Sequence, residues 1–267
     1  MDIQAIIMAL GLTLVAGLST GIGSLLAFFA KATNTRFLSG ALGLSGGVMV
    51  YVSFMDLLPE SIESLSSIFQ GKLPEVYALA AFFAGVLLIA AIDYLIPEDE
   101  NPHEMHNYGE LNDRSGHNHH IKRAGVMVAL AIGIHNFPEG LATFVAALDG
   151  IEVALPIVVA IAIHNIPEGV AVSVPIYYAT GDKRKALRYS FLTGLAEPLG
   201  AGVGAAFLLP FWNPVIGALL LALVAGIMVY ISFDELLPSA EQYGHHHCAI
   251  IGVVAGMAIM AGGLLLF

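Results

Sequence analysis

Charged side chains are scarce in this sequence. Only 12% of its 267 residues are Asp, Glu, Lys or Arg, whereas about a quarter of the residues are charged in an ordinary soluble domain. Long uncharged runs cover residues 3–30 and 249–267, and about 20 apolar residues are enough to cross a bilayer as a helix. The scarcity of charge therefore excludes a soluble globular fold and predicts an integral membrane protein.

Basic residues and cysteine are also few. Ten Lys and Arg stand against 21 Asp and Glu, and because nucleic-acid binding needs clustered basic groups, nucleic acid is excluded as a partner. The single cysteine, Cys248, cannot form a disulfide within the chain. No Lys or Arg precedes the first apolar run, so this run lacks the positive start of a cleavable signal peptide and is interpreted as a membrane span. An acidic balance in a lipid-embedded chain favours a cationic ligand.

Apolar runs separated by polar or turn-forming residues predict eight membrane-spanning helices. The expected spans are 3–30, 37–58, 75–96, 124–148, 152–179, 188–209, 214–237 and 248–267. The predicted fold is therefore all-α and polytopic, with residues 1–267 forming one transmembrane transport domain. A polar loop at 97–123, which contains several histidines, is expected on the cytoplasmic side.

The basic residues predict the orientation of these spans, because Lys and Arg of short loops stay on the cytoplasmic side. If the N-terminus lies on the outer side of the membrane, one basic residue, Lys72, also falls on the outer side. The other nine of the ten fall on the inner side: Lys31, Arg36, Arg114, Lys122, Arg123, Lys183, Arg184, Lys185 and Arg188. Both termini are therefore predicted to lie outside.

One sequence segment occurs twice, in spans that cross the membrane in opposite directions. MVYVSFMDLLPE at 49–60 is repeated as MVYISFDELLPS at 228–239, in the second and seventh predicted helices. Such inverted repeats are typical of secondary transporters. We therefore expect helices 1–3 and 6–8 to form an inverted repeat around a central pair, helices 4 and 5.

Ionisable residues gather in the middle of three predicted spans. HNFPEGLA at 135–142 is followed by HNIPEGVA at 164–171, and GLAEPLG at 194–200 adds a third carboxylate. Because such groups are costly inside a membrane, they usually face a protein interior, a water path or an ion. Hydrogen-bonded contact between helices is the simpler interpretation, but two matching sets and a further carboxylate favour an ion site.

Helix geometry indicates what these motifs can bind. At about 100° per residue, Glu139 points between His135 and Asn136, so its carboxylate can be shared by two neighbouring ions. The fifth helix repeats this pattern, and imidazole with carboxylate and amide oxygens suits zinc or iron better than calcium. The candidate metal ligands are His135, Asn136, Glu139, His164, Asn165, Glu168 and Glu197.

At these motifs the chain resembles the ZIP family of metal-ion transporters, and among them the bacterial zinc transporters. The resemblance covers nearly the whole chain and implies a binuclear site. Its first metal would be bound by His135, Glu139, His164 and Glu168, and its second by Asn136, Glu139, Asn165, Glu168 and Glu197. It also implies zinc import into the cytoplasm across a bacterial inner membrane, by sliding of one helix bundle against another. Iron, manganese, cobalt and cadmium are further substrates that it suggests.

An intramembrane zinc enzyme is the main alternative, but its HExxH motif is absent, because Asn follows each motif histidine. A di-iron bundle would favour Glu-x-x-His pairs, whereas these motifs run His-x-x-x-Glu. We therefore expect no enzymatic activity and no cofactor, with the divalent metal ion as substrate and the lipid bilayer as surroundings. The sequence leaves open a channel-like mechanism, proton coupling, the order of metal preference and whether the chain forms a homodimer.

Two groups of residues outside these motifs can be interpreted either as metal ligands or as ordinary solvated side chains. Acids at Asp56, Glu60, Asp234 and Glu235 are expected at opposite mouths of the membrane region, as entrance and exit ligands or as interfacial acids. Histidines of the inner loops could collect metal or could simply be solvated: His103, His106, His117, His119, His120, His245, His246 and His247.

Overall fold

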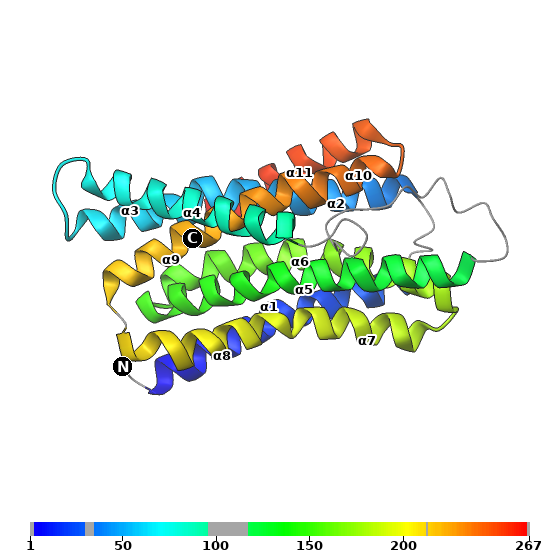
Figure 1. The fold of residues 1–267 in the computed structure, drawn as a ribbon, viewed down its shortest axis with the longest axis horizontal. Helices are drawn as coiled ribbons and strands as arrows, with labels where there is room; N and C mark the ends of the chain where they lie inside the picture. Colours follow the sequence, from blue (N-terminus) through cyan, green and yellow to red (C-terminus); the bar gives the residue numbers. More distant parts are fainter. Residues whose placement is uncertain (1–2, 30–34, 96–116, 212, 266–267) are drawn as a thin grey trace.

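The computed structural model describes residues 3–29, 35–95, 117–211 and 213–265, and every regular element in them is helical (Figure 1). The elements are α1 (Ile3–Phe29), α2 (Thr35–Val52), η1 (Ser53–Leu57), α3 (Leu58–Ser66), α4 (Leu73–Leu95), α5 (His117–Asp149), α6 (Ile151–Thr180), α7 (Lys183–Gly194), α8 (Ala196–Leu208), η3 (Leu209–Phe211), α9 (Pro214–Ile231), η4 (Ser232–Leu236), α10 (Leu237–Gln242) and α11 (His246–Leu264). The all-α prediction is confirmed.

Several elements join end to end into longer rods, which gives eight rods in the described residues. These joined rods are α2–η1–α3, α7–α8 and α9–η4–α10. In the part of the chain that the structure describes, six helices are long and apolar enough to cross a membrane: Gln4–Leu25, Thr35–Ser66, Leu73–Tyr94, Ile151–Val174, Pro214–Gln242 and His246–Leu264. The other two predicted spans coincide with α5 and with the α7–α8 rod. The chain is therefore a multi-pass membrane protein.

The second and seventh spans continue beyond the ends that the sequence predicted, which were directly before Pro59 and Pro238. Helix extends instead to Ser66 and Gln242. In both rods a π-helical turn precedes the proline, and an N–H bonds to a carbonyl five residues back. The proline then falls in the first turn of the next helix, where its missing N–H costs little.

The rods form two bundles, drawn as a lower and an upper layer in Figure 1. Bundle A consists of α1, α5, α6 and α7–α8, and bundle B of α2–η1–α3, α4, α9–η4–α10 and α11. Helices touch across the boundary chiefly where α2 lies against α6 and α5 against α9. The two copies of the repeated segment both belong to bundle B.

Glycine allows the close helix contacts inside each bundle. In bundle A, a Cβ on Gly17 would lie 2.2 Å from the carbonyl oxygen of Gly194, and in bundle B one on Gly43 would lie 2.2 Å from that of Ala249. All such approaches to backbone in the described residues join helices of the same bundle. Each bundle is thus packed backbone to backbone, whereas side chains fill the boundary between the two.

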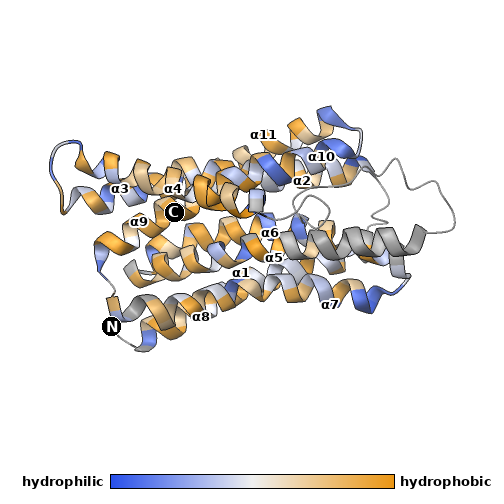
Figure 2. Ribbon diagram, in the orientation of Figure 1, coloured by the Kyte–Doolittle hydropathy of each residue, from blue (hydrophilic) through white to orange (hydrophobic). Residues whose placement is uncertain are grey.

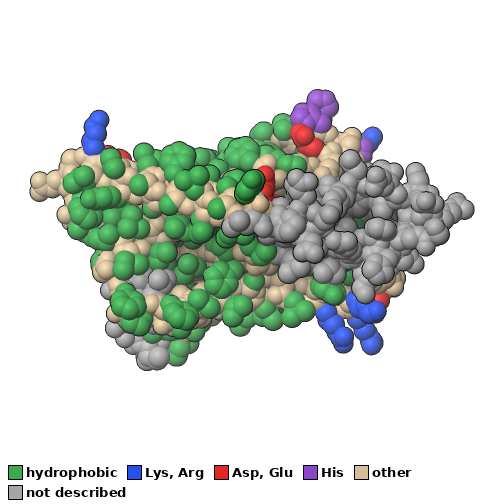
Figure 3. Space-filling view, in the orientation of Figure 1, with side chains coloured by type: hydrophobic (Ala, Val, Ile, Leu, Met, Phe, Trp, Pro, Cys, Tyr) green, Lys and Arg blue, Asp and Glu red, His purple; other side chains and the backbone are tan. Residues whose placement is uncertain are grey.

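The distribution of polar groups is that of a membrane protein. Hydrophobic colours dominate the middle of the described rods in Figure 2, and charged side chains gather at the two ends in Figure 3. Large apolar side chains are exposed around the outside, such as Leu87 at 68% on α4 and Ile251 at 68% on α11. Buried carboxylates and amides lie instead in the interior, mainly in bundle A.

Candidate metal transport site

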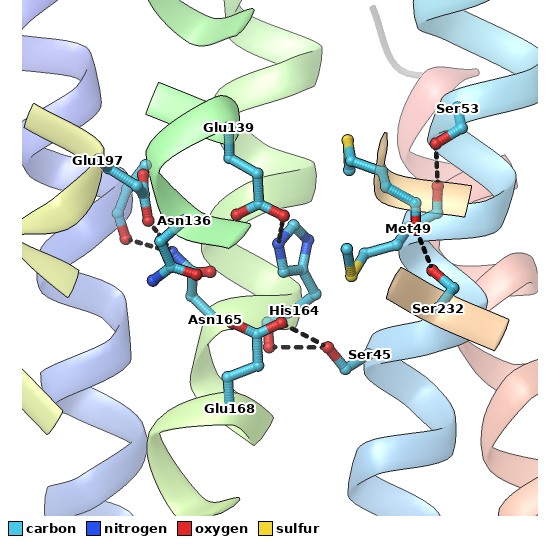
Figure 4. Close-up of polar contacts among 12 residues, drawn as sticks. Ser45, Met49, Ser53, Asn136, Glu139, His164, Asn165, Glu168, Glu197 and Ser232 are labelled. Carbon is cyan, nitrogen blue, oxygen red and sulfur yellow. Dashed lines mark hydrogen bonds and ion pairs between the residues drawn. The ribbon is translucent and has the colours of Figure 1, made fainter. Parts of the chain in front are cut away.

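Three helices of bundle A bring the predicted ligands together in one buried layer (Figure 4). α5 contributes Asn136 and Glu139, and α8 contributes Glu197. α6 contributes His164, Asn165 and Glu168. All six side chains have an exposed fraction of 0%. The seventh, His135, lies on α5, but its side chain is outside the described residues.

The glycines of the motifs explain how these helices come so close. A Cβ on Gly140, the glycine of HNFPEG, would lie 1.9 Å from the carbonyl oxygen of Glu197 on α8. A Cβ on Gly200 of GLAEPLG would lie 2.1 Å from the carbonyl oxygen of Phe137 on α5. α5 and α8 therefore touch through both motifs at once, which places the Glu197 side chain beside the α5 and α6 ligands.

One half of the site faces bundle B. Nε2 of His164 lies 3.1 Å from Oε1 of Glu139, so the two HNxPEG motifs are in direct contact. Ser45 on α2 donates a hydrogen bond to Oε1 of Glu168 at 3.1 Å and a longer one to the carbonyl of His164 at 3.4 Å. The Ser45 hydroxyl therefore links the two bundles at the level of the site.

The other half lies deeper in bundle A. Nδ2 of Asn165 donates to Oε1 of Glu197 and, at 3.0 Å, to the carbonyl of Ala16 on α1. Nδ2 of Asn136 donates to the carbonyl of Thr193 at 3.4 Å. Both amide groups are thus oriented by their N–H donors, which leaves the amide oxygens to bind other groups.

Three buried oxygens of this site have no hydrogen-bond donor in the described part of the chain: Oδ1 of Asn136, Oε2 of Glu139 and Oδ1 of Asn165. An unsatisfied buried polar atom costs about 1–3 kcal/mol. Because all three are lone-pair acceptors, they match a cation and not an anion. The buried described residues include no Lys or Arg to offset the carboxylates, and a buried charge needs a counter-charge or a proton.

The described side chains do not by themselves form a finished coordination shell. Among them, no group of three or more His, Cys, Asp or Glu is arranged to hold a metal ion. That search includes neither the asparagines nor the side chain of His135. The structure thus brings six of the seven predicted residues together, while their assignment as ligands stays a prediction.

The repeated segments contain a feature that the sequence analysis missed. In both copies a serine hydroxyl bonds to the carbonyl four residues back, Ser53 to Met49 and Ser232 to Met228, each at 2.7 Å. A π-turn begins at each of these serines, and such turns are frequent at functional sites. The Ser-Phe and Leu-Leu-Pro residues shared by the two copies were the available sequence signal for these turns. Nothing in the sequence indicated that Ser45 would contact the site.

Three of the four acids that the sequence predicts for the two mouths lie on these π-turns. Asp56 is half-buried on η1, and Glu235, its counterpart in the repeat, is buried on η4 with 4% exposed. Asp234 is exposed, and Glu60 is half-buried on α3. Their assignment to opposite mouths and their role as ligands stay predictions.

The histidines that the sequence predicts for the inner loops are only partly described. His103 and His106 lie outside the described residues, and α5 begins at His117 instead of residue 124, so His117, His119 and His120 are helical with undescribed side chains. Nε2 of His245 lies 2.9 Å from Oγ1 of Thr35, and Nδ1 of His246 lies 2.7 Å from Oε1 of Glu241. These two imidazoles therefore have local partners.

Known proteins similar to this chain have one description in common. The protein named Zinc transporter ZupT in Nitratidesulfovibrio vulgaris is 58% identical to this chain over 270 residues, with 98% of each chain covered. The one in Streptococcus mutans is 56% identical over 264 residues, with 99% of each chain covered. The one in Clostridium perfringens is 53% identical over 279 residues, covering 100% of this chain and 98% of that protein.

A family model described as ZIP Zinc transporter matches residues 95–263. This range contains both HNxPEG motifs and Glu197, which are the residues that the structure gathers inside bundle A. The sequence resemblance, the buried site and the similarity to curated proteins agree: this chain belongs to the ZIP family of zinc transporters.

Proposed function

We propose that the protein is a secondary transporter that imports divalent metal ions, zinc first among them, into the cytoplasm. The observation that carries this proposal is the buried layer of carboxylate, imidazole and amide groups in bundle A, with acceptor oxygens that no described donor satisfies. The relatives named as zinc transporters support zinc as the substrate.

In this proposal the layer binds two ions. Glu139, His164 and Glu168, with His135, would form the first site. Asn136, Asn165 and Glu197 would complete the second, with the two HNxPEG carboxylates shared between the ions. Zinc accepts nitrogen and oxygen ligands together, and the three carboxylates would nearly neutralise two divalent ions. Iron, manganese, cobalt and cadmium are further candidate substrates.

The arrangement of the bundles supports a moving carrier. All six described candidate ligands belong to bundle A, and the Ser45 hydroxyl of bundle B bonds to this layer at Glu168 and at the carbonyl of His164. Movement of bundle A past bundle B would carry the bound ions with it and expose them alternately to the two sides. We place the protein in a bacterial inner membrane with both termini outside, because nine of its ten basic residues then face the cytoplasm.

A metalloenzyme is not favoured. The residue after each motif histidine is Asn136 or Asn165, which cannot act as a general base, and Nδ2 of Asn165 is already engaged by Glu197 and Ala16. A channel with the same ligands would differ from a carrier by flux that does not saturate with metal concentration.

Zinc uptake into proteoliposomes tests the proposal. Radioactive zinc uptake should saturate for the wild-type protein and be lost in the double variant Glu139→Gln plus Glu168→Gln. The matched control is Glu63→Gln plus Glu75→Gln, two exposed carboxylates of α3 and α4, which should keep wild-type uptake. A wild-type protein that binds zinc tightly but moves none would overturn the transporter proposal.

A further inference from the structure

A cluster of basic side chains stands at the start of α7, at the end of bundle A that the sequence places in the cytoplasm. Lys183, Arg184, Lys185 and Arg188 are all exposed. Figure 3 shows this group as blue side chains projecting beyond the apolar body of the molecule. Four basic residues within six positions are the densest positive charge in the sequence.

The outward face of the α7–α8 rod locates this cluster relative to the membrane. Arg184 and Arg188 begin a stripe at helical spacing that continues as Leu192, Leu195 and Leu199. The three leucines are exposed by 63%, 45% and 61%, as expected for side chains against lipid. The face therefore changes from basic to apolar within one turn, about 6 Å of helix, so we expect Arg188 where hydrocarbon gives way to headgroups.

The acid beside the cluster, Asp182, already accepts hydrogen bonds from backbone N–H groups. Asp182 is the N-cap of α7, and its Oδ1 accepts hydrogen bonds from the N–H groups of Arg184 at 2.9 Å and Lys185 at 3.3 Å. In the described part of the chain, no carboxylate forms an ion pair with Arg184, Lys185 or Arg188. Three cations at headgroup level thus lack a counter-charge from the described protein.

We propose that the α7 basic cluster, Arg184, Lys185 and Arg188, binds the headgroups of anionic phospholipids in the cytoplasmic leaflet. Basic clusters directly next to a membrane span attract anionic lipids, and guanidinium groups match phosphate by paired hydrogen bonds. α6 and α7 are joined by a short turn at Gly181 and Asp182, so the cluster is anchored directly to the helix that carries His164, Asn165 and Glu168.

The position of the cluster gives the bound lipid a regulatory role, an extension that rests on the proposed transport function. α7 belongs to bundle A, so lipid held at its basic end restrains that bundle relative to the membrane surface. At the same end, bundle B presents a single exposed arginine of α2, Arg36, together with Glu241, His246 and His247. Anionic lipid should therefore act mainly on bundle A, where the basic residues are clustered, and change the rate at which bundle A moves past bundle B.

The test first measures lipid contact, which does not depend on transport. The full-length protein is reconstituted in phosphatidylcholine with a photoactivatable phosphatidylglycerol, and cross-linked peptides are mapped. We expect cross-links at 182–192 that the triple variant Arg184→Gln, Lys185→Gln and Arg188→Gln loses at least fivefold. The matched variant Arg184→Lys plus Arg188→Lys keeps the charge and should keep most of the cross-link, and Lys72→Gln, at the opposite end, should not change it.

The second measurement is initial zinc uptake in phosphatidylcholine alone and in mixtures with phosphatidylglycerol. The wild-type rate should change at least twofold with the anionic lipid, and the triple Gln variant should show one rate in both membranes. Soluble glycerol phosphate should not substitute for the lipid; if it did, the cluster would be a site for free phosphate and the lipid proposal would be overturned. The lipid proposal would also be overturned if the wild-type protein gave no cross-links on α7, or if the triple variant kept them. Either result would count even if zinc uptake proved normal.

Discussion

At the scale of single residues, the asparagines show how the candidate site would be prepared for an ion. Nδ2 of Asn165 is committed to Glu197 and to the Ala16 carbonyl, and Nδ2 of Asn136 to the Thr193 carbonyl. The amide planes are therefore fixed by the protein, and each amide oxygen is directed away from those donors. A ligand oxygen held in this way loses little freedom when an ion binds, which favours binding.

Asn165→Ala should lower zinc uptake at least tenfold. The substitution removes a candidate ligand oxygen and also the donor to Glu197, and a hydrogen bond to a charged group contributes about 1.5–3 kcal/mol. The measurement is initial uptake against zinc concentration. Asn213→Ala is the control: this exposed asparagine caps α9 through Ile216, so its loss should cost about 1 kcal/mol of stability and leave uptake unchanged. Equal uptake by Asn165→Ala and wild type would contradict the assignment.

At the scale of helices, glycine determines which elements move together. The Cβ that Gly140 lacks would overlap the Glu197 carbonyl oxygen at 1.9 Å, whereas a Cβ on Gly133, two turns earlier on α5, would meet no described atom within 4 Å beyond its own helix. These two glycines share a helix but differ in function. The first allows contact with α8, while the second only lowers the helix propensity of α5.

Gly140→Ala should therefore destabilise the protein by about 1–3 kcal/mol, the usual cost of overpacking, and lower zinc uptake by separating α8 from α5. Gly133→Ala should be neutral or slightly stabilising, because alanine favours helix over glycine. Thermal unfolding in detergent measures both variants against wild type. A Gly140→Ala protein with wild-type melting temperature would show that the α5–α8 contact yields easily.

The helices also show where sequence reasoning succeeds and where it stops. Apolar runs predicted the membrane spans, and the HNxPEG repeats with Glu197 predicted which residues the interior gathers. The π-turns before Pro59 and Pro238 were missed because an extra residue per turn leaves no mark in the apolar pattern, and proline alone suggests a helix end. Ser45 was missed because its role arises from the contact between α2 and α6, which local sequence does not encode.

At the scale of the whole molecule, the division into two bundles separates binding from support. Backbone contacts through glycine lie within each bundle, while the layer of candidate ligands meets bundle B at the Ser45 hydroxyl. When the bundles shift, side-chain contacts between them can be replaced by other side-chain contacts at a modest cost in free energy. Close backbone contacts cannot be replaced in this way. This arrangement favours motion of bundle A as a unit, and its direction relative to the cell depends on which ends of the rods face the cytoplasm.

Cysteine labelling in intact cells determines that orientation. In a Cys248→Ser background, Lys72→Cys lies beyond α3 and Gln242→Cys lies at the end of α10, and both positions are exposed. A membrane-impermeant maleimide should label Lys72→Cys in intact cells and Gln242→Cys only after permeabilisation, because Lys and Arg collect on the cytoplasmic side. The reverse pattern would place the α7 basic cluster and the inner histidines outside. Metal leaving the site toward the α10–α11 end would then be exported, so this result also constrains the direction of transport.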